Sequence, residues 1–361
     1  MITKEIIRQI PKVDLHDHLD GGLRPKTIIE LAKERNINLP SYDEKELSAW
    51  FTRGCKQKSL TLYLETFAVT VAVLQDKEAL KRAATEALED LKKDNVVYAE
   101  IRFAPNLHTQ KDLTMDEAVN AVLEGISEGK RKTGISWGLI LCAMRNQDPI
   151  ISTEVAKLAV AYRNKGVVGF DLAGDESGYP PKNHIEAFQY IRKQNFNITI
   201  HAGEGFGLES IWQAIQICGA HRIGHGTRLI DDMVIEGTKI NKMGSLAHFI
   251  QDRRIPIEMC LSSNVGTGAA TDFANHPFNT FFRNNFRVFL NVDNRLMSNT
   301  TLTDEMAFAA EHFGLTLRDL EKITVNAMKS AFIHHNDKLK IIFDVIKKGY
   351  SDLRKEWNLT D

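Results

Sequence analysis

Cysteine is scarce in this chain, and the four cysteines form no recognisable pair. Cys55, Cys142, Cys218 and Cys260 are far apart, and no Cys-X-X-Cys occurs. This spacing argues against a structural zinc ribbon and against a redox-active dithiol. We therefore expect four reduced thiols in the hydrophobic core.

Long uncharged apolar runs and an excess of either charge are also missing. No stretch approaches the roughly 18 apolar residues of a membrane-spanning helix, and charges interrupt the apolar pairs of residues 1–10, so we expect no signal peptide. The formal net charge is -1, and no basic run typical of a polyanion-binding surface occurs. We expect a cytoplasmic protein with a small-molecule ligand, no membrane partner and no nucleic-acid partner. The oligomeric state stays open.

Short β-branched runs alternate with longer helical stretches along the chain. The runs span residues 12–18, 96–105, 135–145, 167–174, 198–204, 222–227, 255–263 and 287–293. Eight βα units in about 350 residues predict an α/β fold, a closed (β/α)8 TIM barrel rather than an open sheet. No Gly-X-Gly-X-X-Gly turn favours a dinucleotide-binding sheet, and no linker divides the chain. We expect residues 1–361 to form a single domain.

The segment between the first and second runs is too long for one crossover helix, so extra helices are expected after the first strand. Helical periodicity covers residues 25–35, 59–74 and 76–93. The middle range has an apolar face at i, i+3, i+4 and i+7, made by Leu60, Tyr63, Leu64 and Phe67. Such a face is usually core, but a position after the first strand also allows a hydrophobic lid over a barrel active site.

The C-terminal region is expected to be helical scaffold over residues 304–348. Thr316 and Asp319 have the spacing of a capping box before an apolar helical pattern. The adjacent pair His334 and His335 is interpreted as surface, because neighbouring residues are poorly spaced to share a metal ion.

His16 and His18 are two residues apart at the end of the first predicted strand. Side chains at i and i+2 of a strand point to the same face, so both imidazoles can reach one metal ion. A lone His-X-His is a weak motif. Its meaning depends on partners elsewhere in the chain.

Further polar residues follow the ends of other predicted strands. The fifth run ends in His201 and Glu204, the sixth contains His225, and the eighth ends in Asp293. A barrel presents its catalytic groups at the carboxyl ends of its strands, so these side chains are expected to converge. Each histidine alone is more often structural, but four of them at the strand ends of one barrel favour a functional site.

Three imidazoles and one carboxylate suit a borderline ion such as Zn2+, one per chain, with a further position open for water. The expected ligands are His16, His18, His201 and Asp293. Glu204 is the candidate proton donor, and His225 is the candidate for orienting the water at the metal.

These residues resemble the adenosine deaminase family of the metal-dependent amidohydrolases. The matching pieces, in family order over essentially the whole chain, are LHDHLDG (15–21), DLAGDE (171–176), HAGE (201–204), GHG (224–226), CLSSN (260–264) with HP (276–277), and NVDN (291–294). The resemblance implies the same four zinc ligands, Glu204 as the acid that protonates purine N1, and His225 beside the attacking hydroxide.

The resemblance also implies a nucleoside pocket. Gly174 matches the glycine whose backbone contacts the purine, and Asp20 matches the carboxylate that accepts the ribose 5′-hydroxyl. The implied hydrophobic wall over the substrate consists of Leu60, Tyr63, Leu64 and Phe67. Better-known members have an aspartate where this chain has Asn294, and an asparagine amide can donate to purine N7 without first being protonated.

The implied reaction is hydrolytic deamination of adenosine and 2′-deoxyadenosine to the 6-oxo products and ammonia, as in purine salvage. A two-metal barrel hydrolase is a rival, but residues 171–174 lack the bridging lysine such enzymes commonly use. Deaminases of free adenine, AMP or 5′-modified adenosines remain open. An anionic Asp20 disfavours a 5′-phosphate, and free adenine has no group for it to bind. A metal-binding scaffold without catalysis is expected to have lost a ligand or the acid.

Overall fold

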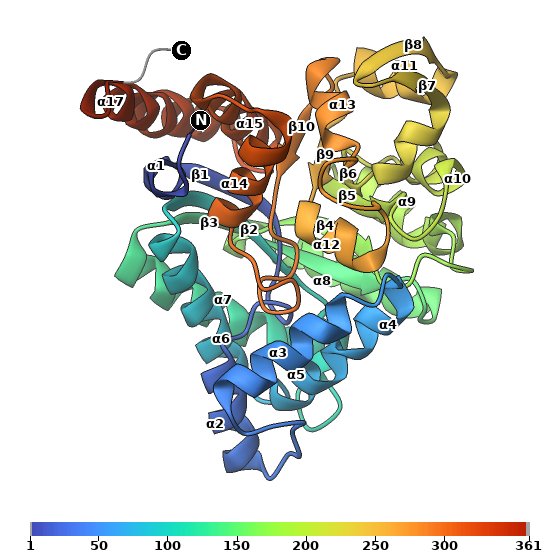
Figure 1. The fold of residues 1–361 in the computed structure, drawn as a ribbon. Helices are drawn as coiled ribbons and strands as arrows, with labels where there is room; N and C mark the ends of the chain where they lie inside the picture. The colour runs from blue at the N-terminus through green and yellow to red at the C-terminus, as the bar shows by residue number, and fades with distance from the viewer. Residues whose placement is uncertain (1, 359–361) are drawn as a thin grey trace.

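In the computed structural model, which describes residues 2–358, eight parallel strands form one sheet in the order β1-β2-β3-β4-β5-β6-β9-β10 (Figure 1). The strands are β1 (Lys12–His18), β2 (Val96–Phe103), β3 (Ser136–Met144), β4 (Val167–Ala173), β5 (Asn197–Ala202), β6 (Arg222–His225), β9 (Ile257–Met259) and β10 (Val288–Leu290). Seven lie within predicted runs, and β5 begins one residue before its run of 198–204. The strand prediction is therefore confirmed.

The first and last strands of this sheet meet and close the barrel. His18 N–H donates to the Asp293 carbonyl (2.8 Å), and Asp293 N–H donates to the His16 carbonyl (2.8 Å). These two bonds join the end of β1 to the segment that follows β10. The expected (β/α)8 TIM barrel is the fold observed.

Helices connect successive strands and surround the barrel (Figure 1). The main ones are α6 (Lys77–Lys93), α7 (Met115–Thr133), α8 (Pro149–Ala161), α9 (Ile185–Lys193), α10 (Leu208–Trp212), α11 (Ser245–Asp252), α12 (Leu261–Thr267) and α13 (Phe278–Arg283). In α6 the buried residues Leu80, Ala84, Leu88 and Leu91 recur at helical spacing, which gives the helix one apolar face. Burial of such faces against the strands and neighbouring helices builds the core.

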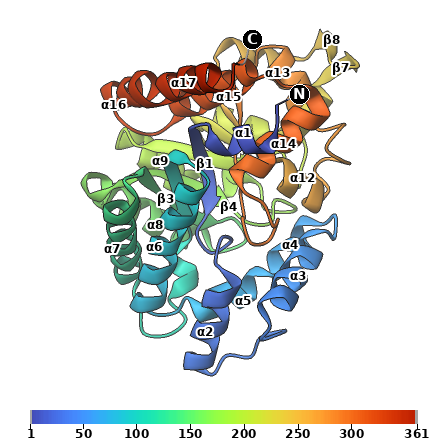
Figure 2. The ribbon, with the colours of Figure 1, turned by 60° about the vertical axis from the view of Figure 1, so that its left-hand side comes forward.

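Extra helices after β1 gather at the carboxyl end of the barrel (Figures 1 and 2). They are α2 (Pro25–Arg35), α3 (Glu44–Cys55), α4 (Leu60–Glu65) and α5 (Phe67–Val73). The first matches its predicted range, whereas α3 was not expected. The helical pattern expected over residues 59–74 is confirmed, but it is divided into α4 and α5 at Thr66, whose Oγ1–H donates to the Tyr63 carbonyl (2.7 Å). Such side-chain bonds to the backbone compete with helix continuation.

The amino end of the barrel is covered by α1 (Lys4–Gln9) and the C-terminal helices (Figure 2). These are α14 (Leu302–Phe313), α15 (Leu317–Ser330), α16 (His335–Lys340) and α17 (Lys348–Glu356), with a wider helical turn over residues 341–347. The capping box of Thr316 and Asp319 is confirmed at the start of α15. His334 and His335 are exposed, as expected.

A small antiparallel hairpin outside the barrel, β7 (Met233–Glu236) and β8 (Lys239–Met243), was not predicted. Within residues 2–358, all four cysteines are free and buried. Over the same residues, no helix combines the length and apolar character needed to cross a bilayer.

Candidate active site

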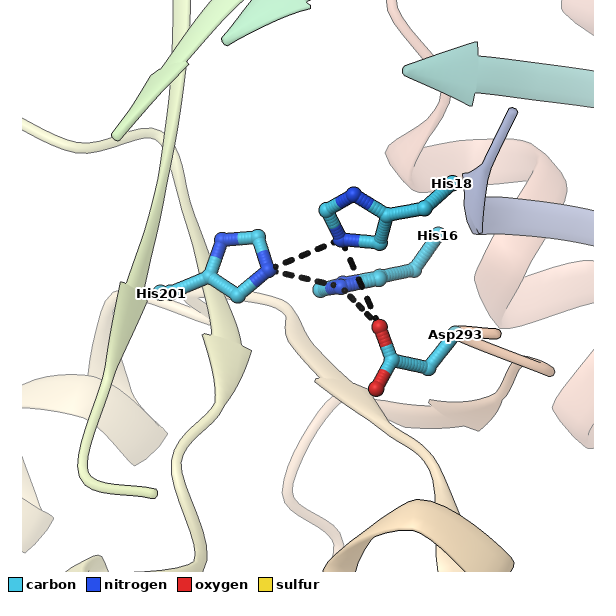
Figure 3. A group of neighbouring side chains, drawn as sticks. All are labelled: His16, His18, His201 and Asp293. Atoms are coloured by element: carbon cyan, nitrogen blue, oxygen red, sulfur yellow. Dashed lines mark hydrogen bonds and ion pairs between the residues drawn. The ribbon is translucent and has the colours of Figure 1, made fainter. Parts of the chain in front are cut away.

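Four side chains with metal-binding atoms meet at the carboxyl end of the barrel (Figure 3). His201 Nε2 lies 3.0 Å from His16 Nε2 and 3.1 Å from His18 Nε2. Asp293 Oδ1 lies 3.3 Å from His16 Nε2 and 3.4 Å from His18 Nε2. One atom of each side chain therefore faces a common point.

This spacing fits a single tetrahedral metal ion. Ligand bonds of about 2.0–2.1 Å place tetrahedral ligand atoms about 3.3 Å apart, close to the distances of 3.0–3.4 Å in the cluster. Burial lowers the pKa of His18 well below its usual value, which keeps this imidazole neutral and able to bind a metal. The lone pairs of the three Nε2 atoms and of Asp293 Oδ1 repel one another at these distances unless a cation lies between them. The cluster is therefore suited to hold a metal ion.

Two buried carboxylates behind the cluster fix the orientation of two imidazoles. His16 Nδ1–H donates to Glu258 Oε2 (2.7 Å), and His201 Nδ1–H donates to Asp171 Oδ1 (3.2 Å). With Nδ1 protonated, each ring presents the lone pair of Nε2 to the cluster.

Arg102 of β2 joins these two carboxylates. Its Nη1 donates to Asp171 Oδ2 (2.9 Å) and its Nη2 to Glu258 Oε2 (2.8 Å), with all three side chains fully buried. Burial acts to raise the pKa of Glu258, but the guanidinium groups of Arg222 and Arg102 hold that pKa well below its usual value. The orienting carboxylates therefore stay ionised inside the barrel.

Asp293 reaches the cluster from a strained backbone position. Its φ is +63°, a value that non-glycine residues rarely adopt. The two backbone bonds to β1 hold this conformation, and Ser263 Oγ–H donates to Asp293 Oδ2 (2.6 Å). With Oδ2 engaged by the hydroxyl, Oδ1 is the oxygen left to face the histidines.

Glu204 follows β5 and turns its carboxyl group into the cavity beside the cluster. Glu204 Oε2 lies 3.5 Å from His225 Nε2. Burial raises the pKa of Glu204 well above its usual value, and the nearby negative charges of Asp293 and Glu176 act in the same direction. The side chain is therefore suited to hold a proton near neutral pH.

A chain of hydrogen bonds fixes the tautomer of His225. Phe278 N–H donates to His276 Nδ1 (3.1 Å), so the proton of His276 is on Nε2 and is donated to Asn264 Oδ1 (3.1 Å). The Asn264 amide then donates from Nδ2 to His225 Nδ1 (3.0 Å). The His225 proton is left on Nε2, which faces Glu204.

The cluster opens into a cavity of about 320 Å³, a size typical of small-molecule sites. Every residue predicted for the site lines this cavity except His16, which lies fully buried behind it. The hydrophobic side chains of α4 and α5 form one wall, namely Leu60, Tyr63, Leu64 and Phe67. Gly174 at the end of β4 has a φ of +99°, a conformation that side-chain-bearing residues rarely adopt.

Besides the Tyr63 hydroxyl, two polar side-chain atoms of residues that line this cavity have no hydrogen-bond partner within residues 2–358. Within residues 2–358, Asp20 Oδ1 and Asn294 Oδ1 are buried but accept no hydrogen bond. Burial raises the pKa of Asp20 to about 6, so its carboxylate is still largely ionised at neutral pH. Unpaired buried polar atoms are costly, which makes both residues candidates for contact with a polar ligand.

No role was predicted from the sequence for the charged residues behind the cluster. Glu258 lies among apolar neighbours in its strand run, and Arg102 lies two residues after Glu100 in an otherwise mostly apolar run. Charges in such positions were the available sign of buried ion pairs. Their pairing could not be read from the sequence, because β2 and β9 are not neighbours in the sheet.

An eight-stranded parallel barrel with metal-binding side chains at its carboxyl end is the arrangement of a metal-dependent barrel hydrolase. Residues 11–348 match the family described as adenosine deaminase. The chain is 52% identical over 357 residues to adenosine deaminase 1 of Streptomyces coelicolor, covering 97% of this chain and 90% of that protein. It belongs to the adenosine deaminase family, whose members are hydrolases acting on C–N bonds.

Solved structures support the same fold. An amidohydrolase from Burkholderia ambifaria with bound Zn superposes with a TM-score of 0.86 at 23% identity, covering 99% of this chain and 96% of that chain. An adenine deaminase from Arthrobacter aurescens gives a TM-score of 0.85 at 23% identity, covering 96% and 99%. At this identity the likeness concerns the fold alone.

Proposed function

We propose that this protein is a zinc-dependent adenosine deaminase. It converts adenosine and water to inosine and ammonia, and 2′-deoxyadenosine to 2′-deoxyinosine in the same way. The observation that carries the proposal is the opening of the four-residue cluster, together with Glu204 and His225, into one small-molecule cavity. Family membership supports the same reaction.

The metal in this proposal is one Zn2+ ion held by His16, His18, His201 and Asp293. When bound, zinc supplies Lewis acidity that lowers the pKa of a coordinated water toward about 7. The donor set of three imidazoles and one carboxylate supports zinc over the hard cations Mg2+ and Ca2+, which prefer oxygen ligands.

Glu204 acts as the general acid in this proposal. Its carboxyl proton passes to N1 of the purine as the oxygen of water bonds to C6, so that negative charge does not build up on the ring. Of the two protons that the water gives up, one passes to the amino nitrogen, so that the C6–N bond breaks and ammonia leaves, and the other restores the Glu204 carboxyl group. General acid catalysis of this kind contributes typically about 10²–10⁴-fold to the rate. His225 donates its Nε2 proton in a hydrogen bond to the oxygen of the attacking water and so orients it.

The remaining cavity residues bind the nucleoside. The Asp20 carboxylate accepts a hydrogen bond from the ribose 5′-hydroxyl, and the Asn294 amide donates to purine N7. The backbone of Gly174 contacts the purine, and the apolar wall of α4 and α5 excludes water from the ring. These roles follow the family motif and are supported by the presence of all these residues around one cavity.

The anionic Asp20 favours a nucleoside over AMP and over free adenine as the substrate. A 5′-phosphate carries like charge and is repelled, and free adenine leaves the carboxylate unpaired. We further propose a cytoplasmic role in purine salvage, which the four free cysteines support because disulfides are rare in that compartment.

The test of this proposal is a substrate panel on the zinc-loaded protein, followed by ultraviolet absorbance and ammonia release. We expect turnover of adenosine and 2′-deoxyadenosine, and much slower turnover of adenine and AMP. A 5′-thioether analogue of adenosine reports on tolerance at the 5′ position. Turnover of AMP or adenine in preference to adenosine would overturn the assignment of the substrate.

A single substitution tests the role of Glu204. We expect Glu204→Gln to lower kcat for adenosine by about 10²-fold or more, because the amide has no acidic proton to transfer. Zinc content, measured by atomic absorption, is expected to stay at one per chain. Near-normal turnover by this variant would remove Glu204 from the mechanism.

A further inference from the structure

The loop that carries Glu204 wraps around the carboxylate of another buried residue. Glu176, from the loop after β4, accepts hydrogen bonds from four consecutive backbone N–H groups of residues 203–206. Its Oε1 accepts from Gly203 N (2.6 Å), and its Oε2 accepts from the N–H groups of Glu204 (2.9 Å), Gly205 (2.7 Å) and Phe206 (3.1 Å). The loop is thus a nest of backbone donors of the kind that binds anions, with a carboxylate of the same chain as the anion.

This contact has little freedom to rearrange. Glu176 is only 4% exposed, and a buried carboxylate is stable only when its oxygens are hydrogen-bonded. Gly203 has a φ of +75°, and a Cβ there would lie 2.5 Å from Ile211 Cδ1. The backbone turn that directs four N–H groups to one carboxylate therefore requires glycine at position 203.

The opposite side of the same turn is held as well. Thr227 Oγ1–H donates to the Gly203 carbonyl (2.6 Å), and Arg228 N–H donates to the same oxygen (3.0 Å). The peptide group between Gly203 and Glu204 is thereby bonded at its oxygen and at its nitrogen. The Glu204 side chain leaves this fixed backbone toward the cavity, where its carboxyl group lies beside His225.

We propose that Glu176 is a positioning residue for the reaction, which fixes the backbone of Glu204 so that its carboxyl group meets purine N1. This inference rests on the proposed function, since it assigns a partner to the acid of that reaction. Glu176 itself touches neither the proposed substrate nor the cluster of His16, His18, His201 and Asp293. It holds the backbone of Glu204 through the four N–H bonds to the loop, and its negative charge also acts on the Glu204 carboxyl group.

Two substitutions at position 176 remove different numbers of the hydrogen bonds that the side chain accepts from residues 203–206. Gln can place its single oxygen toward three of the donors but turns an N–H group toward the fourth, whereas Ala removes all four acceptor contacts. A displacement of about 1 Å at a reacting group can cost about 10²-fold in rate. We expect Glu176→Ala to lower kcat for adenosine by about that factor and Glu176→Gln by about tenfold or less, with zinc content close to wild type.

A matched control is Asp232→Asn. Asp232 is another carboxylate that accepts a backbone hydrogen bond, from Ala247 N (2.8 Å) at the start of α11. We expect this variant to lower the melting temperature by an amount similar to Glu176→Gln without lowering kcat. If Asp232→Asn and Glu176→Gln lowered kcat equally, the loss would reflect general destabilisation, and the proposed positioning role of Glu176 would be wrong.

Ligand binding gives a readout that does not depend on turnover. Inosine carries a hydrogen on N1 that can bond to Glu204, whereas 1-deazaadenosine has carbon in place of N1 and cannot use that contact. We expect Glu176→Ala to weaken inosine binding, measured by calorimetry, by about tenfold, the size expected for a hydrogen bond to an acidic group. Binding of 1-deazaadenosine is expected to change by less than about twofold. Equal weakening of both ligands, or of neither, contradicts the inference.

The outcomes also separate this inference from the function on which it rests. If wild-type protein loaded with zinc does not deaminate adenosine, the proposed function fails. If wild type is active and both position-176 variants keep wild-type kcat and inosine affinity, the function stands and the positioning role of Glu176 is wrong. In a Glu204→Ala background, we expect Glu176→Ala to cause no further loss of inosine affinity, because residues that act through one another are not additive.

Discussion

In the proposed mechanism, the choice of substrate depends on Asp20. Its Oδ1 is buried in the cavity, and within the described chain it accepts no hydrogen bond. Strand alternation from His16 and His18 would also place Asp20 on their face, but β1 ends at His18 and Asp20 lies in the turn that follows. From the sequence, the role is therefore suggested by the family motif alone. The cavity lining now supplies a physical reason, since an unpaired buried carboxylate oxygen needs a donor from a ligand.

Removal of this carboxylate is expected to affect adenosine specifically. We predict that Asp20→Ala lowers kcat/KM for adenosine by about 10–100-fold, the equivalent of a hydrogen bond to a charged group. The matched substrate is 5′-deoxyadenosine, which lacks the hydroxyl and is expected to react equally well with variant and wild type. Steady-state kinetics with both substrates checks this, and an equal loss on both would argue against the contact.

Glu305 is a buried carboxylate outside the proposed mechanism. It accepts hydrogen bonds from Ser262 N (3.2 Å) and Thr300 Oγ1 (2.8 Å), and burial raises its pKa to about 7. In the unfolded chain this group titrates near its usual value of 4.5. Between these two pH values the folded state binds more protons than the unfolded state, so the free energy of unfolding falls as pH rises through this window.

Glu305→Gln is expected to remove this pH dependence. The amide oxygen can accept from Ser262 N, and the Thr300 hydroxyl can rotate to accept from the amide nitrogen. We predict that the variant is more stable than wild type at pH 8 by on the order of 2 kcal/mol, with little difference at pH 5. Urea unfolding at the two pH values measures this. If the variant differed from wild type by the same free energy of unfolding at pH 5 and at pH 8, ionisation of Glu305 would not be the cause of the difference.

At the scale of secondary structure, three strands act together behind the metal ligands. β4 supplies Asp171, β2 supplies Arg102, and β9 supplies Glu258, and their hydrogen bonds cross the barrel interior to reach the histidines of β1 and β5. Partners that orient metal-binding histidines commonly change metal affinity by about 10–100-fold.

A substitution on β9 tests this arrangement. We predict that Glu258→Gln weakens zinc affinity by about 10–100-fold, because the neutral amide binds the His16 Nδ1 proton less strongly. The matched control is Glu100→Gln on β2, where the carboxylate is equally buried but pairs with Arg222 and Tyr98. Competition with a chromophoric chelator measures both affinities. Equal affinities in the two variants would contradict the orienting role of Glu258.

Local sequence patterns were sufficient for most elements and insufficient for a few. The eight strand runs and α2 were predicted within a few residues because period and composition are local properties. The break at Thr66 depends on one side-chain hydrogen bond. The signal of α3 was present and was missed: Asp43 is its N-cap, and Leu47, Phe51 and Cys55 follow at helical spacing. The β7–β8 hairpin has mostly exposed residues, so it shows no buried alternation.

At the scale of the molecule, barrel closure creates the site. His16 and Asp293 lie near opposite ends of the chain and become neighbours only because the segment after β10 pairs with the end of β1. The sequence could predict which residues meet, since the strands of a barrel end on one face. It could not predict the Arg102 bridge, the His276–Asn264–His225 relay or the loop around Glu176, because these depend on side-chain directions in the closed barrel.

In the proposed mechanism, one zinc ion in this cluster makes the protein an adenosine deaminase. A titration of metal-free protein with zinc, following adenosine loss by absorbance and ammonia release at each addition, tests this. We predict no turnover without metal, a linear rise that ends at one zinc per chain, and equal amounts of inosine and ammonia. Full activity in metal-free protein, or no deamination of adenosine after one equivalent has bound, would contradict it.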